Sequence, residues 1–314
     1  MKIAIFHDAF SAVGGSEKLV IGLAQSLGAD IITSQASEQV VDLLREKDIT
    51  LIPLGSSIND PLLRTRTALK RFSECDFREK YDFFIFSGIH SIYAANKHRP
   101  ALWYCHHIDK GLYYSAPKFF FQRLRRMIPV HVPLSRTFFN CLHVFRNSGF
   151  AGLRELARDL RVLWFVKTAE GDSAIVAHIA KIVVNSEHTK RAVRSVFNRD
   201  SSVIYPGIDV SKYSFQESAE FWLSVNRIEP HKRVAMQIDA FKELPNERLI
   251  IVGQKGDDPK CNAILNHLPD NVTYKGVVSQ EELAILYARC KGFITTAKDE
   301  DFGMTAIEAL ASGK

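Results

Sequence analysis

Short apolar segments alternate with segments of helical spacing along most of this 314-residue chain. The first series of expected strands covers residues 2–6, 31–33, 50–52, 83–86, 101–105, 182–184 and 203–205. Helical patterns such as those at 16–27 and 187–197 fill most of the gaps. This alternation predicts an α/β fold with mostly parallel sheets, covered by helices on both faces. Ligands of such sheets bind beyond the carboxyl ends of the strands.

A second series of the same kind follows. It contains expected strands at 221–225, 248–252, 272–274 and 292–296, with helices at 234–244 and 280–288. The length of the chain suits two domains. We therefore expect an N-terminal α/β domain over residues 1–215 and a C-terminal α/β domain over residues 216–314.

The segment 299–314 reads D-E-D-F-G-M-T-A-I-E-A-L-A-S-G-K and follows the apolar run 293–296. Because helical spacing starts at Met304, this is a strand, a tight glycine turn and a helix. The backbone N–H groups at the start of a helix suit an anion, so Phe302, Gly303 and Met304 are the expected cradle. Glu300 and Glu308 flank this cradle and could reach hydroxyl groups on either side of it.

This segment closely resembles the E-x7-E signature of glycosyltransferase family 4, the retaining enzymes with the GT-B fold. The resemblance implies two Rossmann-like domains with mostly parallel sheets. It also implies that Glu300 holds sugar hydroxyls and that Glu308 accepts hydrogen bonds from a ribose diol. A competing interpretation takes Asp299 and Asp301 as a D-x-D metal motif of the GT-A type. That motif is short and common, and here it comes after two series of strands and helices.

Arg227 and Lys232 follow the first strand of the second series. A nucleotide diphosphate that departs as a leaving group gains negative charge, and two fixed cations can balance this charge without a metal ion. The spacing resembles the R-x-x-x-x-K pattern of the same family and implies this catalytic role. The resemblance further implies that backbone groups of Val277 and Val278 lie near the nucleotide base.

Two features of the first domain also resemble this family. Gly14 and Gly15 open a helix within G-G-S-E, which is not the G-x-G-x-x-G of dinucleotide-binding proteins. The resemblance implies that these glycines let the backbone approach the donor phosphate. His106 ends the run W-Y-C-H, similar to the Y-C-H of the family, which implies contact with the donor sugar or its phosphate, or a role as proton shuttle. A structural histidine is the alternative.

Positive charge is concentrated in residues 111–168, which hold ten Lys or Arg and two acidic residues, 10 − 2 = +8. The whole chain carries +6, so the remainder carries 6 − 8 = −2. Large apolar residues are mixed with the cations, as in helices that lie on membranes. We expect this segment to contact an anionic membrane surface. No recognised nucleic-acid-binding module accompanies it, so no nucleic-acid partner is expected.

Five cysteines are scattered without a C-x-x-C pair, which favours a reducing compartment over disulfides or a metal site. No apolar run reaches the eighteen residues of a membrane span, and the first strand ends too early for a secretory signal. We expect a cytoplasmic protein that can be peripheral on the inner face of the membrane. Neither a metal nor another cofactor is expected.

Together these features predict a metal-independent, retaining hexosyltransferase. It would move a hexose, with mannose favoured, from a nucleotide sugar to a glycan or lipid-linked acceptor. Residues 225–227 and 300–303 look most like the mannosyltransferase branch, which favours GDP-mannose over UDP-sugars. Because the family normally continues beyond S-G-K, we expect the second sheet to be incomplete and the intact enzyme to be longer. A non-catalytic nucleotide-sugar-binding or membrane-scaffold protein is the alternative.

Overall fold

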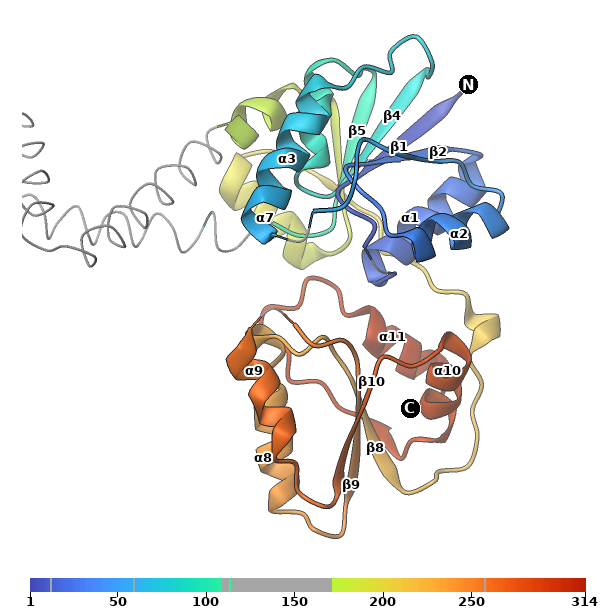
Figure 1. Ribbon diagram of the computed structural model, residues 1–314, viewed down its shortest axis with the longest axis vertical. Coiled ribbons are helices and arrows are strands. Elements are labelled where there is room, and N and C mark those ends of the chain that lie inside the picture. The colour runs from blue at the N-terminus through green and yellow to red at the C-terminus, as the bar shows by residue number, and fades with distance from the viewer. Residues whose placement is uncertain (12, 59, 109–112, 114–170, 257) are drawn as a thin grey trace, which may run out of the picture. The chain divides into compact units, whose positions relative to one another are not determined.

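The computed structural model describes residues 1–11, 13–58, 60–108, 113, 171–256 and 258–314 (Figure 1). These residues form two compact units, Met1–Tyr205 and Pro206–Lys314. Except for Tyr113, the basic segment 111–168 lies outside the described residues, and so does the membrane contact expected of it.

In the described part of the first unit, seven parallel strands follow the order β3-β2-β1-β4-β5-β6-β7. The order reverses between β1 and β4, so a crevice for ligands is expected at the carboxyl ends of these two strands. The strands are β1 (Ile3–His7), β2 (Asp30–Thr33), β3 (Leu51–Pro53), β4 (Phe83–Ser87), β5 (Ala101–Cys105), β6 (Lys181–Val184) and β7 (Ser202–Val203).

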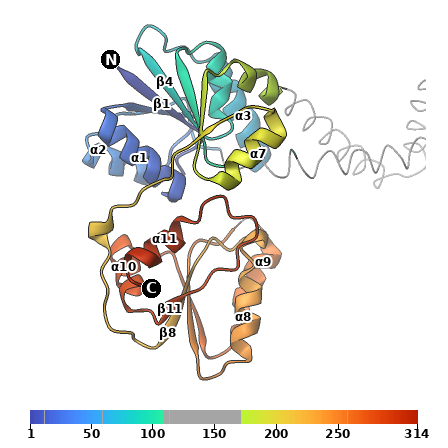
Figure 2. The same cartoon turned by 180° about the vertical axis from the view of Figure 1, so that it is seen from behind.

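Helices cover both faces of this sheet, with α1 and α2 on one side and α3 and α7 on the other (Figures 1 and 2). Successive side chains of a strand point to opposite faces. Accordingly, Ile5 of β1 packs in one core with Val20 of α1, and Phe6 packs in another with Phe72 of α3. The helices are α1 (Gly15–Leu27), α2 (Glu38–Glu46), α3 (Pro61–Glu74), α7 (Glu187–Phe197) and the 3-10 helix η1 (Ser91–Asn96).

The described part of the second unit has four parallel strands in the order β10-β9-β8-β11. Here the order reverses between β8 and β11. The strands are β8 (Phe221–Val225), β9 (Arg248–Val252), β10 (Val272–Gly276) and β11 (Gly292–Phe293). The helices are α8 (Val234–Lys242), α9 (Pro259–Ala263), α10 (Gln280–Arg289) and α11 (Met304–Ala311), with 3-10 helices η3 (Val210–Lys212), η4 (Pro230–Lys232) and η5 (Ile264–Asn266).

Two cores lie on the two faces of this second sheet. Leu223 packs in one core with Tyr287 of α10, whereas Leu249 of β9 packs in the other with Phe241 of α8. The α/β fold with parallel sheets covered on both faces is therefore confirmed in both units. Within the described residues, no helix is long and apolar enough to cross a membrane.

The strand expected over residues 292–296 is shorter than predicted. After β11, the N–H of Ile294 still donates to the carbonyl of Leu223 at 2.9 Å. The hydroxyl of Thr296 then turns to the carbonyls of Lys232 and Arg233, at 2.9 and 3.1 Å. The chain leaves the sheet because its polar groups are used to join the loop after β11 to the turn after β8.

Candidate functional site

A lysine and a glutamate meet at the point where the strand order of the second unit reverses. Lys232 ends η4, which follows β8, and Glu300 lies in the loop after β11. Lys232 Nζ donates to Glu300 Oε2 at 2.5 Å, although the residues are 68 positions apart. Their side chains are 20% and 37% exposed, so the pair is open to a ligand from solvent. The structure thus brings together two of the residues predicted as catalytic.

The two loops that carry this pair are held together by further hydrogen bonds. Besides the contacts of the Thr296 hydroxyl, Arg233 Nε donates to the Thr296 carbonyl at 2.7 Å. Gln237 of α8 is buried and donates from Nε2 to Thr296 Oγ1 at 2.9 Å. Thr296 is therefore the centre of a small network that sets the separation of Lys232 and Glu300.

Two residues next to the pair have an unusual backbone conformation. Arg233, directly after Lys232, has φ of 53°, and Asp299, directly before Glu300, has φ of 56°. A non-glycine residue pays roughly 1–2 kcal/mol for the left-handed conformation. Such strain clusters at functional sites, where the surrounding structure holds it in place. The strained backbone on both sides of the pair is consistent with a binding site.

The glycine turn and helix predicted from the closing segment are both present. Gly303 is the N-cap of α11, which starts at Met304, and has φ of 87°. The first N–H groups of a helix have no acceptor within the helix and favour an anion. A Cβ atom on Gly303 would lie 3.5 Å from Glu300 Cγ, so this helix start is next to the Lys232–Glu300 pair. Phe302 is partly buried in the same turn.

Glu308 lies inside the second unit. It is 3% exposed on α11, and the hydroxyl of Tyr287 donates to its Oε2 at 3.0 Å. Burial raises the pKa of Tyr287, and the charge of Glu308 raises it further. The same two causes, in the same order, raise the pKa of Tyr213. Tyr287 and Tyr213 therefore both interact with the carboxylate, and its contact with a ribose diol stays a prediction.

The other predicted residues of the second unit lie on its surface or edge. Arg227 is exposed two residues beyond β8, and within the described part of the chain its guanidinium makes no hydrogen bond or ion pair. Val277 is 74% exposed after β10, and Val278 packs against the core that contains Leu286. No contact among the described residues joins Arg227 to Lys232, so their joint action stays a prediction.

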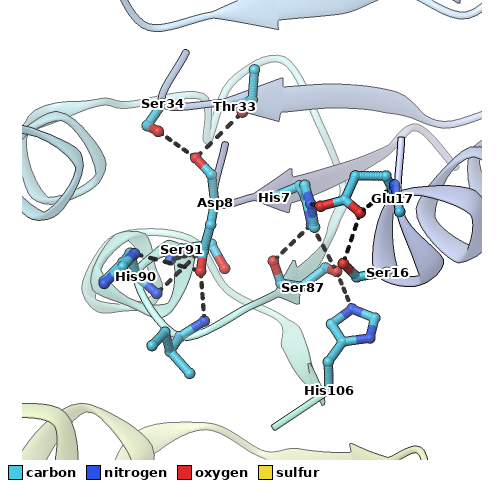
Figure 3. A network of polar contacts seen from close by, with 12 residues as sticks. His7, Asp8, Ser16, Glu17, Thr33, Ser34, Ser87, His90, Ser91 and His106 are labelled. Atoms are coloured by element: carbon cyan, nitrogen blue, oxygen red, sulfur yellow. Dashed lines mark hydrogen bonds and ion pairs between the residues drawn. The ribbon is translucent and has the colours of Figure 1, made fainter. Parts of the chain in front are cut away.

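In the first unit, polar side chains gather at the carboxyl ends of β1, β4 and β5 (Figure 3). His106 follows β5 and is 8% exposed. Its Nε2 lies 2.7 Å from Ser87 Oγ at the end of β4. Burial lowers the pKa of His106 to about 3, assisted by the nearby charge of His7. His106 is therefore a neutral imidazole at physiological pH.

His7 links this histidine to α1. Its Nε2 lies 3.3 Å from Glu17 Oε1, and its Nδ1 lies 3.1 Å from both the carbonyl and the hydroxyl oxygen of Ser87. Burial alone would raise the pKa of Glu17. The hydrogen bond with His7 and the charge of that ring outweigh burial and lower the pKa to about 2. The carboxylate is thus ionised beside His7.

Glu17 also occupies the glycine loop. Its Oε2 accepts hydrogen bonds from the Gly14 N–H and the Ser16 hydroxyl, each at 3.0 Å. The bond to the Gly14 N–H is one half of a capping box at the start of α1, which begins at Gly15, because the N-cap glycine has no side chain to supply the other half. Because the Gly14 N–H is already bonded, an approaching phosphate has to rely on the following amides or displace the carboxylate. The predicted role of Gly14 and Gly15 stays a prediction.

Asp8, which follows β1, is bonded to the turn after β4. Its carboxylate accepts from the N–H groups of Ile89, His90 and Ser91 at 2.9, 3.0 and 2.7 Å. The sequence interpretation assigned nothing to Asp8, nor to His7, Glu17 or Ser87. One signal was available, because each of the two strands between which the order reverses ends in a polar residue, His7 or Ser87.

No three His, Cys, Asp or Glu residues of the described chain gather into a group that could hold a metal ion. Asp299 and Asp301 flank Glu300 in the loop after β11. The D-x-D interpretation of these two aspartates stays an alternative prediction.

Comparisons with known proteins agree on the family. Residues 208–314 match the family model described as glycosyl transferases group 1. A D-inositol 3-phosphate glycosyltransferase of Mycobacteroides abscessus is 27% identical over 165 residues, covering 46% of this chain and 37% of that protein. Mannosylfructose-phosphate synthase of Agrobacterium fabrum is 31% identical over 132 residues, covering 36% of this chain and 29% of that protein. The chain thus spans about a third of the length of these curated relatives.

A solved structure supports the fold. Anabaena HepE in complex with UDP-glucose superposes with a TM-score of 0.66 over 99% of this chain and 79% of that one, at 16% identity. At this identity the likeness shows the fold alone, and it confirms the GT-B class. The match of residues 208–314 includes the E-x7-E segment that carried the resemblance. Residues 208–314 thus match the glycosyl transferases group 1 family.

Proposed function

We propose that the protein is a retaining glycosyltransferase that moves a hexose from a nucleotide diphosphate sugar without a metal ion. The contact that carries the proposal is the Lys232–Glu300 pair beside the N-terminus of α11. A nucleotide sugar offers a charged diphosphate, its phosphate oxygens and the hydroxyls of the sugar. A cation, helix amides and a carboxylate lie within one small region and can bind these three features. The cation faces the diphosphate, the amides face phosphate oxygens, and the carboxylate faces sugar hydroxyls.

In this proposal Lys232 stabilises the departing nucleotide diphosphate. The negative charge on the diphosphate grows in the transition state, and a fixed cation in a partly desolvated site is most effective there. Lys232 acts as a point charge, whereas Arg227 can bring a planar fork to two oxygens. Binding of the diphosphate replaces Glu300 as the partner of Lys232, which leaves the Glu300 carboxylate to the sugar. Transfer then proceeds by attack on the same face from which the diphosphate leaves.

The names of similar proteins indicate which donors to test. One relative carries mannose in its name and one structural neighbour holds UDP-glucose, so GDP-mannose and UDP-glucose are the donors to test first. GDP-mannose remains the favoured donor. The acceptor would be a glycan or a lipid-linked glycan. The basic segment 111–168 would bring a cytoplasmic enzyme to the anionic inner face of the membrane.

The test combines donor binding with transfer. Purified protein is screened by thermal shift against GDP-, UDP- and ADP-sugars, and the best donor, radiolabelled, is incubated with a membrane extract. Lys232→Ala should reduce transfer by about 100-fold or more, the scale of a lost transition-state charge contact. Lys291→Ala is the matched control, because Lys291 pairs with Glu247 at 2.8 Å before β11. Donor binding without transfer would instead favour the non-catalytic alternative, and loss of activity with EDTA would favour the metal motif.

A further inference from the structure

Four side chains of the first unit form a continuous row of hydrogen bonds. The row runs from Glu17 of α1 through His7 of β1 and Ser87 of β4 to His106 after β5 (Figure 3). His7 and Ser87 are 4% and 1% exposed, so water does not compete for these bonds. The hydrogen atoms along such a row can be assigned from what each atom is able to donate or accept.

Each ring nitrogen of His7 faces an oxygen atom that can only accept, and Nδ1 also faces the Ser87 hydroxyl at the same distance as the Ser87 carbonyl. Nε2 lies 3.3 Å from the ionised carboxylate of Glu17, and Nδ1 lies 3.1 Å from the backbone carbonyl of Ser87. A neutral imidazole has one N–H and would turn a lone pair toward one of these oxygens. The imidazolium donates to both. The hydrogen bonds therefore favour an N–H group on each ring nitrogen of His7.

An N–H group on Nδ1 of His7 decides which way the Ser87 hydroxyl points. Ser87 Oγ lies 3.1 Å from Nδ1 of His7 and accepts a bifurcated hydrogen bond from that N–H, together with the Ser87 carbonyl. The proton of the Ser87 hydroxyl is therefore directed toward His106. The distance from Ser87 Oγ to His106 Nε2 is 2.7 Å. A neutral imidazole that accepts a hydrogen bond at Nε2 carries its proton on Nδ1. His106 would thus present an N–H group at its other nitrogen.

We propose that Glu17, His7 and Ser87 are positioning residues that hold His106 in its Nδ1–H tautomer, so that His106 donates a hydrogen bond to a phosphate or hydroxyl oxygen of a bound ligand. The identity of that ligand rests on the proposed function, whereas the tautomer does not. No hydrogen bond to Nδ1 of His106 occurs among the described residues. The other charged or titratable groups that act on His106 are His107, which follows it, and Asp8 after β1.

In this arrangement His106 is a donor toward the substrate and not a general base. A base would need a lone pair on the nitrogen that meets the substrate, and here that nitrogen bears hydrogen. A phosphate or hydroxyl oxygen is the partner that an N–H group suits. In this proposal His106 does not shuttle a proton, and its N–H group instead polarises an oxygen atom of the ligand.

The tautomer can be measured without any substrate. Two-bond ¹H–¹⁵N correlation spectra of the ¹⁵N-labelled protein distinguish the two nitrogens of each of its 11 histidines, and the signals of His106 are those lost in His106→Asn. We expect His106 to carry hydrogen on Nδ1 and His7 on both nitrogens. Ser87→Ala removes the hydroxyl but keeps the carbonyl, and should shift His106 toward the Nε2–H tautomer. Ser91→Ala is the control, because the buried hydroxyl of Ser91 has no partner among the described residues.

An Nε2–H signal for His106 in the wild type, or a tautomer that Ser87→Ala leaves unchanged, would overturn the proposal. Transfer assays then test the contact with the ligand. The side-chain amide nitrogen of Asn takes the place of Nδ1 of histidine, so His106→Asn should retain most of the transfer activity. The amide nitrogen of Gln takes the place of Nε2, so His106→Gln should lose about 100-fold in kcat. The opposite order would exclude donation from Nδ1. If the protein transfers no sugar at all, the spectra still decide the tautomer.

Discussion

The backbone of Gly88 lies directly against the carboxylate of Asp8. A Cβ atom on Gly88 would come within 2.4 Å of Asp8 Cγ and 2.5 Å of both carboxylate oxygens, and the φ of Gly88 is 118°. This close approach lets the carboxylate accept hydrogen bonds from Ile89, His90 and Ser91. The end of β1 is thereby joined to the turn after β4, at the point where the strand order reverses.

Gly88→Ala should destabilise the protein by about 2 kcal/mol or more, because the new Cβ meets Asp8 and the backbone conformation is unfavourable for alanine. Unfolding in urea, followed by circular dichroism, measures the loss. Gly22→Ala is the matched control, because nothing lies within 4 Å of a Cβ at Gly22 in α1. Alanine in a helix interior is better than glycine by about 1 kcal/mol, so the control should be neutral or stabilising. Equal effects of both substitutions would contradict the close contact with Asp8.

Glu17 should make stability depend on pH in the acidic range. Burial would raise its pKa, but the hydrogen bond and charge of His7 lower it from 4.5 to about 2. Between these values the unfolded chain binds a proton that the folded protein does not, so this contribution to stability is present above pH 4.5 and is lost as the pH falls toward 2. The slope is at most about 1.4 kcal/mol per pH unit.

Glu17→Gln should therefore be less stable than the wild type at pH 7, and the difference should shrink as the pH is lowered through this range. Denaturant unfolding at several pH values between 7 and about 2 measures it. Glu46→Gln, an exposed residue at the end of α2, is the control and should leave the pH profile unchanged. A constant difference between wild type and Glu17→Gln would mean that Glu17 is not ionised beside His7.

The strands and helices were predictable because the spacing of apolar and polar residues within each short segment is typical of a strand or a helix. A central strand of a parallel sheet is buried on both faces, so it reads as a continuous apolar run. The strands at 101–105, 221–225 and 248–252 and the helix at 187–197 have the predicted bounds. The strand at 292–296 was too long because the hydrogen bonds of Thr296 to another loop overrule a local apolar pattern.

The sites were predictable only in part. The family resemblance placed Lys232 and Glu300 in one function, but their 2.5 Å contact depends on two loops 68 residues apart. The row from Glu17 to His106 was missed, since the bond from His7 to Ser87 joins positions 80 apart. No local pattern carries such a pairing. It follows from the strand order, which puts β1 beside β4 and β4 beside β5.

Thr296→Val should reduce transfer by about tenfold, because the hydroxyl that joins the loops of Lys232 and Glu300 is removed and a misplacement on the order of 1 Å is costly for catalysis. Loss of these partly buried hydrogen bonds should lower the free energy of unfolding by about 1 kcal/mol. The neighbouring Thr295→Val is the control, because Thr295 is exposed. Transfer rates and urea unfolding of both variants measure the two effects. Full activity of Thr296→Val would show that the network does not set the catalytic geometry.

Glu300→Gln should bind a nucleoside diphosphate more tightly while it loses sugar transfer. In the wild type the diphosphate has to replace Glu300 as the partner of Lys232, and the carboxylate also repels it. A partly exposed ion pair is worth up to about 1 kcal/mol, so the affinity for GDP or UDP should rise by about fivefold at most. Titration calorimetry at low and high salt measures this gain, which should shrink as salt screens the charges.

Glu243→Gln removes an exposed charge at the end of α8 and controls for net charge. If Glu300→Gln and Glu243→Gln bind the diphosphate equally well, then Glu300 does not compete for Lys232. Release of Lys232 from its carboxylate partner would then not raise the affinity for the diphosphate, and the proposed contact between Lys232 and the diphosphate would be contradicted.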